Sequence, residues 1–260
     1  MSSLRISMVQ TSLQWENPKS NLEMFSAKLE CIEKGIDLIV LPEMFSTGFS
    51  MKPEQFAESM EGPSIDWLRL KATQLNCVIT GSLIITEKGE YYNRLIWMRP
   101  DGTFDHYDKR HLFSLASEEN HYTAGSNRLI VELKGFRIMP LICYDLRFPV
   151  WSRNDLNYDL VIYVANWPER RSFFWSQLLI ARAIENQSFV LGVNRVGNDG
   201  NGISHTGDSI CLGPLGNPIA QAKPGKEEIV SFEITKGEIE SVQNKFKFLN
   251  DRDSFELSMD

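Results

Sequence analysis

The stretch I-M-P-L-I-C-Y-D-L-R-F-P-V-W, from Ile138 to Trp151, places a thiol directly after an apolar run. Residues 136–142 are short, continuous and mostly apolar, which is typical of a β-strand buried on both faces. Cys143 ends this strand, and a helix is expected around 149–156. Open α/β sheets carry their chemistry at such strand ends, where backbone N–H groups and a helix N-terminus lower a thiol pKa and bind an oxyanion. The stretch therefore predicts a reactive cysteine, with a buried structural cysteine as the alternative.

Further apolar runs alternate with helical patterns along the chain. Strands are expected at 4–10, 37–41, 77–86, 91–99, 136–142, 159–165 and 189–194, and helices at 64–75, 172–186 and 236–246. This alternation, together with several hairpins, indicates an α/β layered fold with mixed sheets. Since no repeat, linker or low-complexity segment interrupts the pattern, a single domain over residues 1–260 is expected.

The composition narrows the class of protein. The chain has 260 residues, 42% of them hydrophobic and 23% charged, with a formal net charge of −7. An acidic chain without a basic stripe argues against a nucleic-acid or membrane partner. No apolar run is long enough to span a bilayer and no leader is evident, so a cytoplasmic protein is expected. The four cysteines are far apart in sequence, which argues against a metal site and against a disulfide framework.

Chemically useful residues follow three of the expected strands. Glu43 follows L-I-V-L-P, Cys143 follows M-P-L-I, and Asn166 and Trp167 follow V-I-Y-V-A. The ends of parallel strands meet at one edge of a sheet, so these side chains are expected to lie close together. A carboxylate beside a thiol can act as a general base, and a nearby lysine stabilises a thiolate and an oxyanion. Lys109 is the candidate, although the pattern alone does not place it in the site.

Three motifs resemble those of the nitrilase, or carbon–nitrogen hydrolase, superfamily. L-P-E-M (41–44), Y-D-K-R-H-L-F (107–113) and L-I-C-Y-D-L-R-F-P (141–149) are similar to its glutamate, lysine and cysteine motifs, and they occur in the same order. The resemblance implies a cofactor-free hydrolase with an α-β-β-α layered domain. It also implies a homodimer or a higher homo-oligomer, in which two such domains stack into an eight-layer sandwich.

The resemblance assigns a role to each of these residues. Cys143 would attack an amide carbonyl and form a thioester. Glu43 would take the thiol proton, pass it to the departing ammonia and later activate water. Lys109 and the backbone N–H of Tyr144 would hold the oxyanion.

A second glutamate helps to position the lysine and the substrate in many members of this superfamily. It lies a few residues before a glycine. Glu118, which lies seven residues before Gly125, fits that spacing best, and its neighbour Glu119 is the alternative.

Two further runs resemble the omega-amidase branch of the superfamily: N-W-P-E-R-R (166–171) and V-N-R-V-G-N-D-G-N-G (193–202). These enzymes hydrolyse the terminal amide of 2-oxoglutaramate or 2-oxosuccinamate. Such a substrate carries a distal carboxylate, so its pocket needs a cation. The candidates are Arg170, Arg171 and Arg195 for the carboxylate, and Phe45, Phe49 and Trp167 for the walls of the pocket. A surface or structural role is the alternative for any one of these arginines.

Other interpretations stay open at this point. Arg147 is expected to pair with a nearby acid and hold the turn after Cys143. The same three catalytic residues would also suit an N-carbamoyl-amide hydrolase or a nitrilase. A non-catalytic binding protein, or a redox sensor that uses Cys143, belongs to a different class. Either is disfavoured because it would need neither Glu43 nor Lys109. The expected partner is a small-molecule amide.

Overall fold

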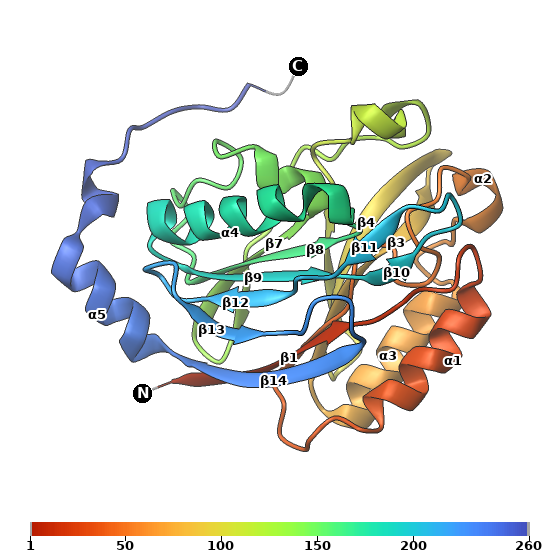
Figure 1. Cartoon of the computed structure of the whole chain (residues 1–260), viewed down its shortest axis with the longest axis horizontal. Helices are drawn as coiled ribbons and strands as arrows, with labels where there is room; N and C mark the ends of the chain where they lie inside the picture. The colour runs from red at the N-terminus through yellow and green to blue at the C-terminus, as the bar shows by residue number, and fades with distance from the viewer. Residues whose placement is uncertain (1, 259–260) are drawn as a thin grey trace.

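Two six-stranded sheets stack face to face in the computed structural model, which describes residues 2–258 (Figure 1). The first sheet has the order β14-β1-β2-β3-β4-β5 and the second has the order β13-β12-β9-β8-β7-β6. The first comprises β1 (Ser3–Gln10), β2 (Leu38–Val40), β3 (Val78–Glu87), β4 (Glu90–Met98), β5 (Phe104–Asp108) and β14 (Glu228–Thr235). The second comprises β6 (Val131–Leu133), β7 (Phe136–Ile142), β8 (Leu160–Ala165), β9 (Phe189–Asn194), β12 (Ile210–Leu212) and β13 (Pro218–Gln221).

Each sheet combines a parallel centre with antiparallel flanks. Strands β1, β2 and β3 are parallel in the first sheet, and β7, β8 and β9 are parallel in the second. The remaining neighbours pair antiparallel. The expectation of mixed sheets is therefore confirmed.

Helices cover the outer faces of both sheets (Figure 1). Helices α1 (Pro18–Leu29) and α3 (Pro63–Leu75) pack on the first sheet, and α4 (Ser172–Asn186) packs on the second. The N-terminus of α1 is capped by Asn17, whose side chain accepts a hydrogen bond from the backbone N–H of Ser20. Helix α5 (Lys236–Phe246) follows β14, and α2 (Pro53–Phe56) is a single turn. This arrangement is the expected α-β-β-α layering.

One hydrophobic core joins the inner faces of the two sheets. It includes Leu4 and Ile6 of β1, Trp97 of β4, and Ile138 and Ile142 of β7, all of them fully buried. A second core lies between the first sheet and helices α1 and α3. The expectation of a single domain stays a prediction. No helix within residues 2–258 has the length and apolar character needed to cross a bilayer.

Two segments differ from the sequence-based expectation. The segment 149–156 forms turns instead of a helix, and the chain after β7 forms a 3₁₀ helix at Cys143–Arg147. Pro149 ends this 3₁₀ helix, because a proline disfavours helical backbone in the preceding residue, and Phe148 is extended. The segment 197–207 is partly ordered as a hairpin of β10 (Val196–Asn198) and β11 (Ser204–Thr206).

Candidate active site

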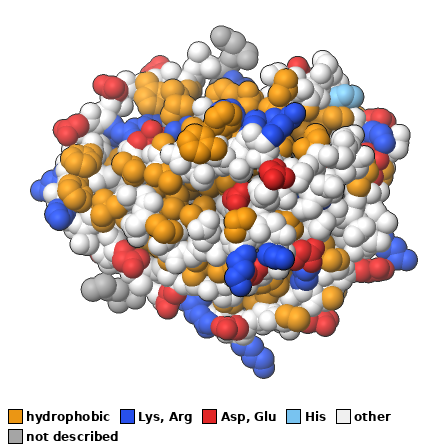
Figure 2. Space-filling model, viewed as in Figure 1, with side chains coloured by type: hydrophobic (Ala, Val, Ile, Leu, Met, Phe, Trp, Pro, Cys, Tyr) orange, Lys and Arg blue, Asp and Glu red, His pale blue; other side chains and the backbone are white. Residues whose placement is uncertain are grey.

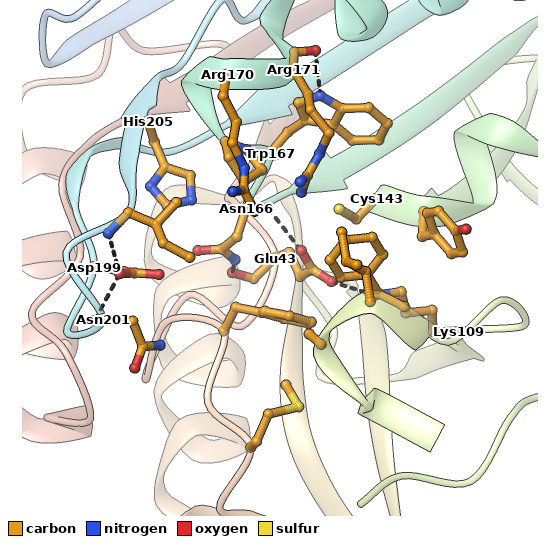
Figure 3. Close-up of a pocket in the computed structure, with 18 of the residues that line it drawn as sticks. Glu43, Lys109, Cys143, Asn166, Trp167, Arg170, Arg171, Asp199, Asn201 and His205 are labelled. Carbon is orange, nitrogen blue, oxygen red and sulfur yellow. Dashed lines mark hydrogen bonds and ion pairs between the residues drawn. The ribbon is translucent and has the colours of Figure 1, made fainter. Parts of the chain in front are cut away.

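A cavity of about 260 Å³ opens at the carboxyl ends of β2, β7 and β8 (Figure 3). Parallel strands bring their ends to one edge, so the residues that follow them meet there. Glu43 follows β2, Cys143 follows β7 and Asn166 follows β8, and all three line the cavity. Lys109, which directly follows β5, also lines the cavity.

A buried ion cluster forms the floor of the cavity. The Nζ atom of Lys109 lies 2.9 Å from Oε1 of Glu43 and 2.9 Å from Oε2 of Glu118. All three side chains are fully buried. Burial alone would lower the pKa of Lys109, but the two carboxylates raise it above its usual value. Lys109 is therefore a fixed cation. We refer to Glu43, Lys109, Glu118 and Cys143 as the catalytic cluster.

The second glutamate of this cluster is Glu118. Its carboxylate contacts Lys109 through both oxygens and accepts a hydrogen bond from the backbone N–H of Phe113. Burial raises the pKa of Glu118, although the charge of Lys109 opposes that shift. Glu119 is exposed on the surface. The structure thus places Glu118, not its neighbour, beside the lysine.

Two asparagines hold the carboxylate of Glu43. Asn93 of β4 donates from Nδ2 to Oε1 over 2.8 Å, and the backbone N–H of Asn166 donates to Oε2 over 2.8 Å. The side chain of Asn166 also donates to the backbone carbonyl of Glu43. Glu43 therefore has its orientation set before any substrate binds. Sequence analysis did not predict a role for Asn93, because a single polar residue within a strand matches no motif.

Cys143 is held in a strained backbone conformation at the start of the 3₁₀ helix. Its φ of +44° lies in the left-handed region, which costs a residue other than glycine about 1–3 kcal/mol. Figure 3 shows its side chain on the same side of the cavity as the carboxylate of Glu43. Tyr144, the expected oxyanion residue, also lines the cavity.

The thiol of Cys143 is protonated at rest. Burial raises its pKa well above the usual value, the charges of Glu43 and Glu118 raise it further, and Lys109 only partly offsets them. This corrects the expectation of a thiol with a lowered pKa, which assumed a full helix after Cys143. The 3₁₀ helix that is present has only five residues, so its dipole is small.

Three arginines line the cavity across from this cluster: Arg147, Arg170 and Arg171. Among residues 2–258 none of them forms a salt bridge with an acid, unlike Arg128, which pairs with Asp155. Arg147 lies over the ring of Trp167, and Arg171 lies over the ring of Phe113. Burial, together with the charges of Arg170 and Arg147, lowers the pKa of Arg171. We refer to these three residues as the arginine cluster.

The expected role of Arg147 is corrected by this arrangement. Instead of pairing with an acid, its guanidinium lies over the rings of Trp167 and Phe174. The nearby acid, Asp145, is occupied by Tyr107 and His111. Arg147 therefore adds a cation to the pocket that the sequence analysis did not place there.

Phe49 and Trp167 line the cavity as expected, but Phe45 does not. Its ring is buried in the core below, 5.6 Å from Phe25 and 5.8 Å from Trp67 between ring centroids. Met44 has a φ of +44°, so the chain reverses there and turns the next side chain away from the cavity.

Arg195 is also placed away from the pocket. Its guanidinium is fully buried and donates to the backbone carbonyls of Leu13, Val196 and Asn198. Burial lowers its pKa to about 10. Because those carbonyls anchor the start of the β10–β11 hairpin, Arg195 has a structural role, which was the alternative for each arginine.

The β10–β11 hairpin closes the remaining side of the cavity. Asp199 accepts hydrogen bonds from the backbone N–H groups of Asn201 and Ile203, which fixes the tip of the hairpin. Asn201 and His205 also line the cavity, and burial lowers the pKa of His205 to about 4. Within residues 2–258 no group of three or more acidic, histidine or cysteine side chains is placed to hold a metal ion.

Known proteins share both the sequence and this architecture. The carbon–nitrogen hydrolase family model matches residues 5–244. An omega-amidase, YafV of Escherichia coli K12, is 46% identical over 99% of this chain and 100% of its own. A 2-oxoglutaramate amidase of Bacillus subtilis is 32% identical over 95% of this chain and 96% of its own.

A solved structure agrees with these relatives. XC1258 from Xanthomonas campestris is described as a CN-hydrolase superfamily protein with an arsenic adduct in the active site. It superposes with a TM-score of 0.96 at 43% identity, and the match covers 99% of this chain and 100% of that one. The resemblance found in the three motifs is therefore confirmed, and the chain belongs to the carbon–nitrogen hydrolase family.

Proposed function

We propose that this protein is an omega-amidase that hydrolyses the terminal amide of small dicarboxylate monoamides, with 2-oxoglutaramate and 2-oxosuccinamate as the model substrates. One observation carries the proposal. A single cavity holds a thiol beside a buried Glu–Lys–Glu cluster and, across from it, arginines that have no acidic partner within residues 2–258. The names of the two full-length relatives, an omega-amidase and a 2-oxoglutaramate amidase, point to the same reaction.

The first step forms a bond between sulfur and carbon. Since the pKa of the thiol is raised, the proton leaves as sulfur attacks, and Glu43 accepts it. The sulfur bonds to the amide carbon, and the carbonyl electron pair moves onto oxygen. Lys109 and the backbone N–H of Tyr144 stabilise that oxyanion. Because Lys109 is held by two carboxylates before the substrate arrives, it needs no reorganisation at this step.

The next steps release ammonia and then the acid. The oxyanion collapses, the bond between carbon and nitrogen breaks, and Glu43 returns its proton to the leaving nitrogen. A thioester remains on Cys143. Water then attacks the thioester carbon while Glu43 takes a proton from it, and the thiol and the carboxylic acid are released. The carboxylate of Glu43 takes part in both half-reactions, so its fixed orientation contributes to the rate of each.

The arginine cluster accounts for the choice of substrate. An unpaired guanidinium in a partly buried pocket is stabilised when a carboxylate binds, and a planar fork suits a carboxylate better than an ammonium does. Arg171 is the preferred candidate, because it is partly buried whereas Arg170 is exposed. In Figure 3 the side chains of Arg170 and Arg171 extend from the same helical turn toward Glu43 and Cys143.

Ammonia release from a panel of compounds tests this proposal. The panel contains succinamate, 2-oxoglutaramate, glutamine, N-carbamoyl-β-alanine and an aliphatic nitrile, with Cys143→Ala as the blank. Fast release from the first two alone supports an omega-amidase. Release from the carbamoyl compound or the nitrile instead would support the same mechanism with a different class of substrate. If no compound of the panel releases ammonia, a binding or redox-sensing protein would be favoured.

We further propose a homodimer or a higher homo-oligomer in the cytoplasm. Figure 2 shows hydrophobic side chains gathered over α4 and the strands beside it. Phe173, Phe174 and Ile184 of α4 and the nearby Leu215 are each about half exposed or more. A second copy of the chain would cover this face. The cytoplasmic location rests on the four free cysteines, which a reducing compartment permits. Light scattering on wild-type protein and on Ile184→Glu tests the assembly.

A further inference from the structure

Asp145 forms a hydrogen-bonded junction directly beneath Cys143. It is fully buried, and its two oxygens accept four hydrogen bonds. Oδ1 accepts from the backbone N–H of His111 at 3.0 Å and lies 2.8 Å from Nδ1 of the same residue. Oδ2 accepts from the hydroxyl of Tyr107 at 2.7 Å and from the backbone N–H of Ile142 at 3.1 Å. No step of the reaction described above uses this carboxylate.

These bonds reach both segments that supply the oxyanion site. Ile142 and Asp145 flank Cys143 and Tyr144, so the side chain closes a ring around the peptide that carries the nucleophile and the oxyanion N–H. Tyr107 and His111 flank Lys109, the other oxyanion donor. A single carboxylate thus joins the two sides of the site.

Tyr107 extends the same junction. Its hydroxyl donates to Asp145 and accepts from the backbone N–H of Arg110 at 3.2 Å and from the indole of Trp151 at 3.0 Å. The backbone of Arg110, which directly follows Lys109, is therefore linked to the carboxylate of Asp145 through the hydroxyl of Tyr107. The network lies outside the cavity lining, and among residues 2–258 none of its side chains forms a hydrogen bond or an ion pair with the arginine cluster.

We propose that Asp145 is a positioning residue that sets the distance between the two oxyanion donors, Lys109 Nζ and the N–H of Tyr144. The inference rests on the proposed function, since it concerns the oxyanion of amide hydrolysis. Cys143 has a left-handed backbone that its own side chain does not favour, so something must hold it, and the bond from Ile142 to Asp145 spans it. A donor displaced by about 1 Å loses much of its effect on the transition state.

The variant Asp145→Asn tests the role without changing the volume of the side chain. All four groups that contact the carboxylate donate hydrogen bonds to it. An amide in its place must therefore point its own N–H groups toward at least one of these donors. We expect kcat for succinamate to fall by about 10²-fold, the usual loss for one misplaced oxyanion donor, with KM within about twofold. Asp159→Asn is the matched control.

Asp159 is also a buried aspartate, but it lies at the opposite end of β8. It accepts from the backbone N–H of Arg137 and from Lys236. We expect Asp159→Asn to lower the stability of the protein without lowering kcat. Both variants are compared at a temperature at which circular dichroism shows each to be folded.

A transition-state probe separates positioning from a general structural role. Succinic semialdehyde presents an aldehyde in place of the amide. The thiol adds across its C=O bond, sulfur bonds to carbon, and the thiol proton passes by way of Glu43 to the oxygen, which occupies the oxyanion site. Asp145→Asn should raise the inhibition constant of the aldehyde by the same factor by which kcat falls. The inhibition constant of succinate, which makes no such adduct, should stay unchanged.

Two results would overturn the inference. One is a fall in kcat with no change in aldehyde binding, and the other is an equal weakening of aldehyde and succinate. If Asp145→Asn does not fold, Tyr107→Phe decides the matter, because it removes one hydroxyl from the junction and should show a smaller effect with the same aldehyde-specific signature. A wild-type protein that releases no ammonia from succinamate would contradict the proposed function. If the wild type is active, either of the two results above would contradict the role of Asp145 alone.

Discussion

The two sides of the cavity differ in how their charges are balanced. In the catalytic cluster, Lys109 lies between two carboxylates, and Asn93 and the backbone of Asn166 hold one of them. In the arginine cluster no guanidinium has an acidic partner among the described residues, and aromatic rings lie against two of them. The first side is complete before a ligand arrives. The second side lacks a negative charge, which an anionic substrate would supply.

This difference separates two tasks that one pocket must perform. Groups that stabilise a transition state work best when they are already fixed, because no free energy is then spent on orienting them. Groups that choose the substrate gain most when the substrate provides the missing charge. Variants of the catalytic cluster should therefore act on kcat for every amide, and variants of the arginine cluster should act on anionic amides alone.

Replacing the nucleophile should have the largest effect. Cys143→Ala should lower kcat by about 10⁶-fold, as loss of a covalent nucleophile does in other hydrolases, while the protein stays folded. Ammonia release and thermal unfolding measure the two outcomes. Cys31→Ala is the control, since Cys31 is an exposed thiol far from the cavity. Substantial turnover in the first variant would remove Cys143 from the mechanism.

The adjacent glutamates provide the next test. Glu118→Gln leaves Lys109 with one carboxylate and should lower kcat by about 10²-fold for succinamate and for a neutral amide alike. Glu119→Gln changes an exposed side chain and should stay within about twofold of wild type. Steady-state kinetics on both variants would contradict the assignment of the second glutamate if they lost activity equally.

The arginine cluster should show a selective effect. Arg171→Ala removes a hydrogen-bonded cation, worth about ten- to a hundredfold in binding a carboxylate, and should lower kcat/KM for succinamate by that factor. Succinamide has the same shape without the charge, and its kcat/KM should hardly change. If both compounds lost activity to the same degree, Arg171 would be a structural residue.

The smallest effect concerns the thiol itself. The charge of Glu43 is one of the causes that raise the pKa of Cys143, so Glu43→Gln should lower that pKa. The alkylation rate of Cys143 with iodoacetamide rises with pH as the thiolate forms, and in this variant the rise should occur at lower pH than in wild type. Mass spectrometry of the peptide that contains Cys143 follows the reaction. A profile that moves to higher pH would contradict the electrostatic account.

The sequence predicted the elements that local patterns control. β7 and α4 have the expected bounds, and Glu43 and Cys143 lie together in one cavity at the strand ends, as the sequence pattern predicted. Lys109 was already the candidate lysine, but only the motif resemblance placed it in the site, because its position in the cavity depends on how β5 packs beside the rest of the first sheet. Glu118 required the same tertiary information before it could be told from its neighbour.

The errors arose where the backbone turns at a single residue. The positive φ of Met44 sends Phe45 into the core, where Gly81 leaves room for its ring: a Cβ at Gly81 would lie 2.9 Å from Cδ1 of Phe45. Arg195 resembles a pocket arginine in sequence but is buried under the hairpin that it supports. Neither outcome follows from hydrophobic periodicity, since both depend on long-range packing.

The most direct test of the account is the ratio of kcat/KM for succinamate to that for succinamide in the wild-type protein, with the second value halved because succinamide has two equivalent amides. The two compounds share their reacting bond and their shape and differ by one charge at the far end. If the arginine cluster selects the carboxylate, the ratio should be at least about ten, the lower value for a charged hydrogen-bonded pair. A ratio near one would show that the three arginines do not choose the substrate, and it would contradict the division of the cavity into a catalytic side and a selective side.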